Sequence, residues 1–283
     1  MSRFARLLPP KQRVEPPPRR GTYRAFATTV HQVQDLSARM RRVTLGAPQF
    51  QDYSLCRPDD FFALLLPGER GLELPPEGTT GTTPRGLVAD MPEDHRPEMR
   101  WYTIREHRPQ AGEVDVDIVL HGDGPESGPG SRWASHARRG DPAGFVEGNG
   151  MYNPPPTTRR QLFFADITAV PALAAILESP DPAPGRPRPG AADVAHIEVP
   201  EAGDILDIDT EVAIAWHVRG SQPPGFSIEQ LLRDAPRGEI DYAWVCAEAG
   251  LVKQVRRALV HDSGVPKNAI TFSGYWREGE ART

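Results

Sequence analysis

The chain has 283 residues, of which 38% are hydrophobic and 25% charged, and its formal net charge at pH 7 is -5. This composition is that of a soluble globular protein, and no run of apolar residues approaches the roughly 18 that a membrane span needs. The negative net charge argues against a general affinity for nucleic acid phosphates, and the length allows two domains of ordinary size.

The first 21 residues are basic and rich in proline but lack the apolar segment of a secretory signal, so we expect a cytoplasmic protein. They cannot supply a core, and we interpret residues 1–21 as a flexible or surface-hugging arm. The two cysteines, Cys56 and Cys246, are far apart in the sequence and form no metal-binding motif, so we predict no protein-bound metal.

The segment that follows the arm predicts short strands, because β-branched and aromatic runs are bounded by Gly, Pro and Asp. These runs lie at residues 22–48, 60–68, 99–107 and 113–122, and residues 69–98 predict an irregular loop. Acidic and aliphatic residues alternate in the last run, which places Asp115 and Asp117 on one face of a half-buried strand. A short helix is predicted from Ser131, as its N-cap, to a stop at Gly140.

From residue 157 onward, segments typical of strands alternate with segments typical of helices. The strands are predicted at 161–166, 195–200, 211–219, 240–248 and 268–276, and the helices at 169–179, 227–235 and 250–262. This alternation predicts a parallel sheet covered on both faces. We therefore divide the chain into a β-barrel-like domain at 22–156 and an α/β domain at 157–283.

Two segments have the chemistry of a phosphate site. In RWYTIR, Arg100 offers a bidentate fork to a phosphate, Tyr102 a flat face for a conjugated ring and Thr103 a short hydroxyl. About twenty-five residues later a glycine-rich loop, HGDGPESGPGSRWA, leads into the predicted helix, where free amides can cradle a pyrophosphate. Each segment alone also fits a solvated strand or an ordinary hairpin.

Both segments match known signatures: residues 100–103 the RxY[ST] flavin signature of the ferredoxin-NADP reductase superfamily, and residues 128–131 its GxxS pyrophosphate signature. With ARMRRVTLGAP, DITAVPALAAILE, AWVCAEAGLVKQVRRAL and GYWREG, the chain from about Thr22 to Gly279 resembles the siderophore-interacting protein family, the FAD-dependent ferric-siderophore reductases. The resemblance implies an N-terminal antiparallel Greek-key β-barrel that binds FAD, followed by a parallel α/β domain similar to NAD(P)H-binding domains.

The resemblance also implies site residues. The RWYT segment would hold FAD through Arg100, Trp101, Tyr102 and Thr103. The flavin or its ribityl chain would be lined by Asp117, His121 and Gly122, and the pyrophosphate turn and adenine-side wall would be formed by Gly128, Ser131 and Trp133. A turn facing the nicotinamide of NADH or NADPH would be formed by Asp166, Thr168, Ala169 and Pro171. The other face of the flavin would be covered by Tyr275 and Trp276.

Two departures from the family pattern concern the electron donor. Ala165 and Ile167 stand where the family has glycine and glutamate, which puts nicotinamide use in more doubt than FAD use. Glu147 begins the segment that corresponds to the family's GPxG, and we hypothesise that this extra carboxylate disfavours a phosphorylated dinucleotide.

The resemblance implies reduction of a ferric siderophore, with the chemistry carried by the flavin and not by a catalytic side chain. Ferric siderophores are often anionic, and the basic residues that we expect to capture one are Arg132, Arg277, Arg57 and Lys253. Two alternatives stay open. One is a reductase of the same fold fed by a ferredoxin, and the other is a non-catalytic module that binds a siderophore or a partner.

Overall fold

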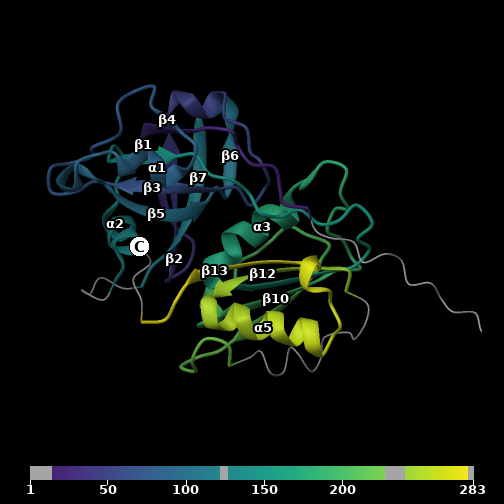
Figure 1. The fold of residues 1–283 in the computed structure, drawn as a ribbon. Helices are drawn as coiled ribbons and strands as arrows, with labels where there is room; N and C mark the ends of the chain where they lie inside the picture. Colours follow the sequence, from purple (N-terminus) through teal and green to yellow (C-terminus); the bar gives the residue numbers. More distant parts are fainter. Residues whose placement is uncertain (1–14, 122–126, 227–239, 280–283) are drawn as a thin grey trace, which may run out of the picture.

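The computed structural model describes residues 15–121, 127–226 and 240–279. The predicted helix at 227–235 and Gly122 lie outside these ranges. None of the helices within them is long and apolar enough to cross a bilayer. Two sheets, one antiparallel and one parallel, make up the structure (Figure 1).

The N-terminal half is an antiparallel sheet with the strand order β5-β3-β8-β1-β2-β7-β6. The two end strands, β5 and β6, do not pair with each other, so the sheet is a half-barrel. Strand β4 pairs with β1 outside this order. Its strands are β1 (Tyr23–Asp35), β2 (Met40–Gly46), β3 (Phe61–Leu66), β4 (Thr80–Gly81), β5 (Glu98–Thr103), β6 (Glu106–Arg108), β7 (Glu113–Val119) and β8 (Pro142–Val146). The fold class is confirmed for this half.

The sequence analysis missed β8, although it pairs with both β1 and β3 in the middle of the sheet. Pro142 and Gly144 interrupt the strand pattern and suggest a turn. Gly144 is needed for packing, because a Cβ there would lie 2.8 Å from the Cβ of Leu65. Behind it, Phe145 stacks on Phe62 at a ring distance of 4.4 Å in the half-barrel core.

Three further predictions for this half are wrong in detail. Helix α2 (Pro129–His136) begins two residues before Ser131, with Gly128 as its N-cap, and ends before Gly140. The loop at 69–98 contains a short helix, α1 (Pro84–Ala89), which Thr83 caps and whose Leu87 is buried. Strand β7 is buried on both faces, because arginine side chains cover its carboxylates.

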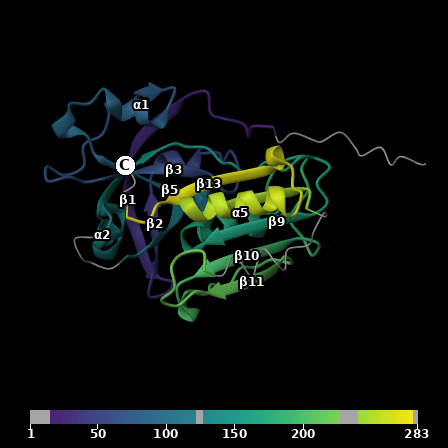
Figure 2. The same cartoon turned by 60° about the horizontal axis from the view of Figure 1, so that its bottom comes forward.

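The C-terminal half is a parallel sheet, as predicted, and its strand order is β11-β10-β9-β12-β13. Its elements are β9 (Gln161–Asp166), α3 (Val170–Glu178), β10 (Val194–Val199), β11 (Ala213–Val218), β12 (Tyr242–Glu248), α5 (Ala249–His261) and β13 (Ile270–Trp276). Helix α3 packs on the sheet face nearer the half-barrel and α5 on the opposite face, where Figure 2 shows it in front of the strands.

An apolar insertion joins the two halves. Met40, at the start of β2, is 1% exposed and lies in the core that α3 forms with the parallel sheet, and Leu36 packs against the same core. Beside this insertion, Arg39 donates to the buried Asp204 at 3.1 Å and to Glu201. The hairpin between β1 and β2 is therefore held by the α/β half through apolar and ionic contacts.

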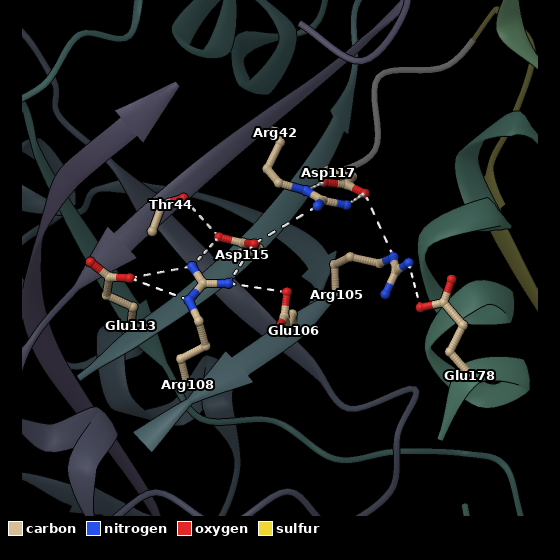
Figure 3. Close-up of polar contacts among 9 residues, drawn as sticks. All are labelled: Arg42, Thr44, Arg105, Glu106, Arg108, Glu113, Asp115, Asp117 and Glu178. Atoms are coloured by element: carbon tan, nitrogen blue, oxygen red, sulfur yellow. Dashed lines mark hydrogen bonds and ion pairs between the residues drawn. The ribbon is translucent and has the colours of Figure 1, made fainter. Parts of the chain in front are cut away.

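An ion-pair network reaches the same junction from β7 (Figure 3). Arg42 holds Asp117 by two hydrogen bonds of 2.7 and 2.9 Å, and the Arg105 Nε lies 3.9 Å from the other side of that carboxylate. Arg105 also donates to Glu178 of α3 at 2.7 Å. The second arginine of RWYTIR thus links the strand that carries the flavin signature to the other half.

A buried carboxylate lies at the connection between the halves. Asp59 is 0% exposed and accepts hydrogen bonds from the backbone N–H groups of Met151 and Tyr152, while the Trp244 indole N–H of β12 lies 3.4 Å away. Burial raises the pKa of Asp59 to about 6, since these donors only partly replace water. Residues 15–20 of the predicted arm also touch this region, where Arg20 pairs with Asp60 at 2.9 Å.

The raised pKa of Asp59 predicts a pH-dependent stability. Its contribution is complete below the ordinary carboxyl pKa of about 4 and is lost as the pH rises through about 6. We expect the free energy of unfolding of the wild type, relative to Asp59→Asn, to fall by about 2–3 kcal/mol between pH 4 and 7.5. Urea titrations measure this difference, with the exposed Asp52→Asn as the control. A pH-independent difference would contradict the assignment.

The Arg105–Glu178 ion pair predicts coupling between the halves. In a double-mutant cycle of Arg105→Met and Glu178→Gln, we expect a coupling free energy of about 0.5–1.5 kcal/mol, because the side chains are only 15% and 26% exposed. The exposed pair Arg70–Asp94, at 3.4 Å, serves as the control and is expected to couple by less than about 0.5 kcal/mol. Equal coupling in the two cycles would show that Arg105 does not link the halves.

Candidate functional site

A cavity of about 1020 Å³ lies where the two halves meet. The half-barrel contributes β5, β7 and the start of α2, and the α/β half contributes the turn after β9 and the end of β13. Ligands of open α/β folds bind beyond the carboxyl ends of the parallel strands, and the cavity lies at these ends. It is the natural candidate for the functional site.

Strand β5 forms one wall of the cavity. Arg100 and Tyr102 are two residues apart on this strand and so share one face. The Arg100 guanidinium donates to Glu98 at 2.7 Å and to the Met99 carbonyl at 2.8 Å. The Tyr102 hydroxyl closely approaches α2, because a Cβ on Gly130 would lie 1.9 Å from it. The aromatic ring and the helix N-terminus therefore form one continuous surface.

The N-terminus of α2 is open to the cavity. Gly128 has no side chain to cap the helix, so the first N–H groups of α2 stay available to an anion. The Ser131 hydroxyl is engaged elsewhere, since it accepts from the backbone N–H of His121 at 2.8 Å. The buried Ser127 hydroxyl, in contrast, has no hydrogen-bond partner within the described ranges.

The α/β half supplies the opposite wall. Thr168 and Pro171 come from the turn after β9, and Tyr275 and Trp276 come from the end of β13. The Tyr275 hydroxyl has the side chains of Thr103 and Cys246 as hydrogen-bond partners, so it ties this wall to β5. Burial raises the pKa of Tyr275 well above its usual range, which keeps the phenol protonated.

His121 lies at the edge of the cavity, with its ring centre 6.5 Å from that of Trp276. Desolvation by the surrounding walls lowers the pKa of His121, and the charge of Asp166 opposes this shift. The imidazole is therefore neutral at pH 7 and can hydrogen-bond to a ligand without adding a charge.

Positive charge is in excess along the cavity. Among the described lining residues the guanidinium groups are those of Arg85, Arg100, Arg132 and Arg277, and the carboxylates are those of Glu98 and Asp117. Asp117 is already neutralised by Arg42, and Figure 3 shows Arg105 on its other side. The cavity is therefore suited to anionic ligands.

Most of the residues predicted for the site line this cavity: Arg100, Trp101, Tyr102, Thr103, Asp117, His121, Gly128, Ser131, Arg132, Thr168, Pro171, Tyr275, Trp276 and Arg277. The structure does not bring five others to its surface. Asp166 and Ala169 are buried behind the wall, and Trp133 packs against the half-barrel core. Arg57 is bound to Asn153, and Lys253 lies on α5 beside Phe272 in a separate hollow.

Several lining residues escaped the sequence analysis, among them Phe61, Arg85, Ser127 and Met151. Arg85 belongs to α1, and no periodicity marks that six-residue helix in a segment rich in Gly and Pro. Of these residues, Ser127 is the one that the sequence could have revealed, because it directly precedes the GxxS signature. Phe61 and Met151 reach the cavity only through tertiary packing.

The structure changes the interpretation of both departures. Glu147 does not face the cavity; it is 3% exposed and bound by Arg24 of β1, which accounts for its charge. The structure therefore gives this carboxylate no place in the cavity lining, and its effect on a phosphorylated dinucleotide stays a hypothesis. Ile167 lies in the core beside α3, so the glutamate absent at this position removes no carboxylate from the cavity lining.

The residues present fit FAD. The uncapped helix start and the unpartnered Ser127 hydroxyl offer donors to a pyrophosphate, and Arg100 adds a cation. Tyr102 provides a flat aromatic face beside them. The volume of about 1020 Å³ is at the upper end of the usual range for ligand sites, which suits an extended dinucleotide.

Comparison with known proteins supports this fit. Residues 29–152 match the family model of the siderophore-interacting FAD-binding domain, and residues 158–279 match that of the siderophore-interacting protein. Ferric vibriobactin reductase ViuB of Vibrio cholerae is 33% identical over 66% of this chain and 67% of its own length. An uncharacterized protein of Mycobacterium tuberculosis is 31% identical over 86% of this chain and 87% of its own.

Solved structures agree. The siderophore-interacting protein SipS from Aeromonas hydrophila is 28% identical, with a TM-score of 0.71 over 91% of this chain and 93% of that one. A ferredoxin NADP+ reductase from Neisseria gonorrhoeae is only 14% identical but has a TM-score of 0.59 over 89% and 99% of the two chains, which shows a common fold. The chain thus belongs to the siderophore-interacting protein family and has the two-domain fold of the ferredoxin-NADP reductases.

Proposed function

We propose that the chain is an FAD-dependent reductase that passes electrons from NADH or NADPH to a ferric siderophore and releases ferrous iron. The observation that carries this proposal is the junction cavity, where an anion cradle and an aromatic wall face the strand ends of a parallel sheet. Bound FAD supplies the chemistry, because it accepts a hydride and gives up single electrons.

The half-barrel residues hold the cofactor in this proposal. Arg100 and the helix start at Gly128 would bind the pyrophosphate, Tyr102 would offer its face to the flavin ring, and Thr103 would offer a hydroxyl to it. The Thr103 side chain is 6% exposed and already hydrogen-bonded to Tyr275, so its orientation is fixed before a ligand arrives. Such preorganisation reduces the entropy that is lost on binding.

The α/β residues guide the electron donor. Thr168, Pro171 and Trp276 stand at the carboxyl ends of the parallel strands, where dinucleotides bind in open α/β folds. The side chain of Ile167 lies in the core beside α3 and does not itself contribute to this wall.

The ferric chelate would be captured by Arg132 and Arg277, which line the cavity beside the flavin motifs. Arg132 donates to the Ser127 carbonyl, so it can keep its place while other N–H groups of its fork meet an anion. Reduction of the iron weakens its binding to hard oxygen ligands, and the siderophore then leaves intact.

An acidic donor protein such as a ferredoxin is the second candidate. It is favoured by the excess of arginines along the cavity, because such a surface attracts an acidic protein as well as an anionic chelate.

An anaerobic visible spectrum of the purified protein tests the function. We expect an oxidised flavin spectrum that bleaches on adding NADH or NADPH and returns on adding a ferric hydroxamate. If only a reduced ferredoxin bleaches the flavin, the electron donor is a ferredoxin and not a nicotinamide. A preparation that binds no added FAD would leave only a binding module.

Ser127→Ala separates cofactor binding from folding. Because the buried hydroxyl has no partner within the described ranges, its removal should leave the unfolding free energy of the FAD-free protein within about 0.5 kcal/mol of the wild type. The Kd for FAD, followed by flavin fluorescence, should rise about three- to tenfold as one hydrogen bond is lost.

Ser131→Ala is the matched control, since the Ser131 hydroxyl accepts from the backbone N–H of His121 and its loss should lower stability. An unchanged Kd in the Ser127 variant would remove Ser127 from the FAD site.

A further inference from the structure

The side chain of Asp166 accepts hydrogen bonds from four donors on three elements. Its Oδ1 accepts from the backbone N–H of Thr168 at 2.9 Å and from the Thr168 hydroxyl at 2.5 Å. Its Oδ2 accepts from the backbone N–H of Glu248 at 2.7 Å and from the Trp276 indole N–H at 2.8 Å. The carboxylate thus joins the turn after β9 to the ends of β12 and β13.

Only a carboxylate satisfies this arrangement. An ionised carboxylate is acceptor-only and offers about four lone-pair positions, which matches the four donors. A carboxamide would direct an NH₂ group at two of these donors and leave them unsatisfied in a buried place. Asp166 is 5% exposed, and burial raises its pKa while the four donors lower it.

The residues that Asp166 holds belong to the wall of the cavity, whereas Asp166 itself does not. Thr168 and Trp276 line the cavity, and both are hydrogen-bonded to the carboxylate behind them. Trp276 is the last residue of β13 and is only partly buried, with the His121 ring 6.5 Å away. The hydrogen bond from its indole N–H to Asp166 is therefore a main constraint on the orientation of the ring.

We propose that Asp166 is a positioning residue that fixes Thr168 and Trp276 as one wall beside the flavin ring and thereby sets how the electron donor approaches. This inference rests on the proposed function, because it assigns the wall to the donor. It also replaces the direct contact with the nicotinamide that the family resemblance implied for Asp166.

Asp193 provides a matched control at the other end of the same sheet. It is 6% exposed and accepts from the backbone N–H of Gln161 at 2.6 Å and of Gly190 at 3.0 Å, so it is also a buried carboxylate that caps backbone amides. It precedes β10, and neither Asp193 nor its hydrogen-bond partners Gln161 and Gly190 are among the described residues that line the cavity. A purely structural role for Asp166 would make the two Asp→Asn variants behave alike.

The experiment compares Asp166→Asn with Asp193→Asn in the FAD-loaded protein. For Asp166→Asn we expect the donor KM for flavin reduction to rise at least tenfold, while the Kd for FAD stays within threefold, because the half-barrel holds the cofactor. Reoxidation of dithionite-reduced protein by a ferric hydroxamate should also stay within threefold. Asp193→Asn should change none of these three quantities by more than threefold.

A spectroscopic readout on the FAD-free protein is independent of the donor. The fluorescence emission of Trp276 is obtained as the difference between each protein and its Trp276→Phe version. In Asp166→Asn this emission should shift in wavelength and be quenched more strongly by acrylamide. In Asp193→Asn neither change is expected. Trp276→Phe alone removes one of the four donors and should raise the donor KM at least threefold, which keeps the test valid if Asp166→Asn folds poorly.

The outcomes separate the two proposals. If neither nicotinamide reduces the wild-type flavin, the proposed donor is wrong, and the Trp276 emission alone decides whether Asp166 positions the wall. The inference is overturned if the donor KM and the Trp276 emission of Asp166→Asn match those of Asp193→Asn.

Discussion

The burial of a half-barrel hairpin in the core of the other half determines the geometry of the whole molecule. Met40 gains its apolar environment from α3 and the parallel sheet, not from its own sheet. Exposing it would cost about 1.5–3 kcal/mol, so the two halves have a strong reason to stay together. The cavity exists because this contact brings β5 opposite the ends of β9 and β13.

Charged groups around this apolar contact restrict the arrangement further. Arg39 and Arg105 each reach a carboxylate of the α/β half, and Asp59 receives backbone donors from the connection between the halves. Such groups are satisfied in only one relative orientation, whereas apolar contacts tolerate small shifts. The orientation of the two walls is thus fixed by hydrogen bonds whose partners come from both halves.

The sequence predicted the strands and helices of the α/β half well, because β9, α3 and β12 are largely apolar segments bounded by clear breaks. It predicted the half-barrel less well. Strand β8 contains Pro142, which is tolerated as the first residue of the strand, and Gly144, which is needed for a packing contact that only the folded sheet reveals. The two signature segments predicted where the cavity lies, because the residue types that bind a phosphate or a ring are recognisable within each short segment.

The functions of buried polar residues were not predictable in this way. Nothing in the sequence distinguishes Glu147, which is paired with Arg24, from a carboxylate that faces a ligand. Asp166 matched a family turn, but its four donors come from residues up to 110 positions away. Roles of this kind depend on contacts between distant segments, and one chain without its structure does not report them.

The contact between Gly130 and Tyr102 has a consequence for the family's history. A Cβ at position 130 would overlap the phenol oxygen, so the small residue in one signature and the tyrosine in the other occupy a single shared volume. Position 130 is one of the two variable positions of GxxS, so relatives with a larger residue there should lack the phenol hydroxyl at position 102. Residues 102 and 130 are therefore expected to covary.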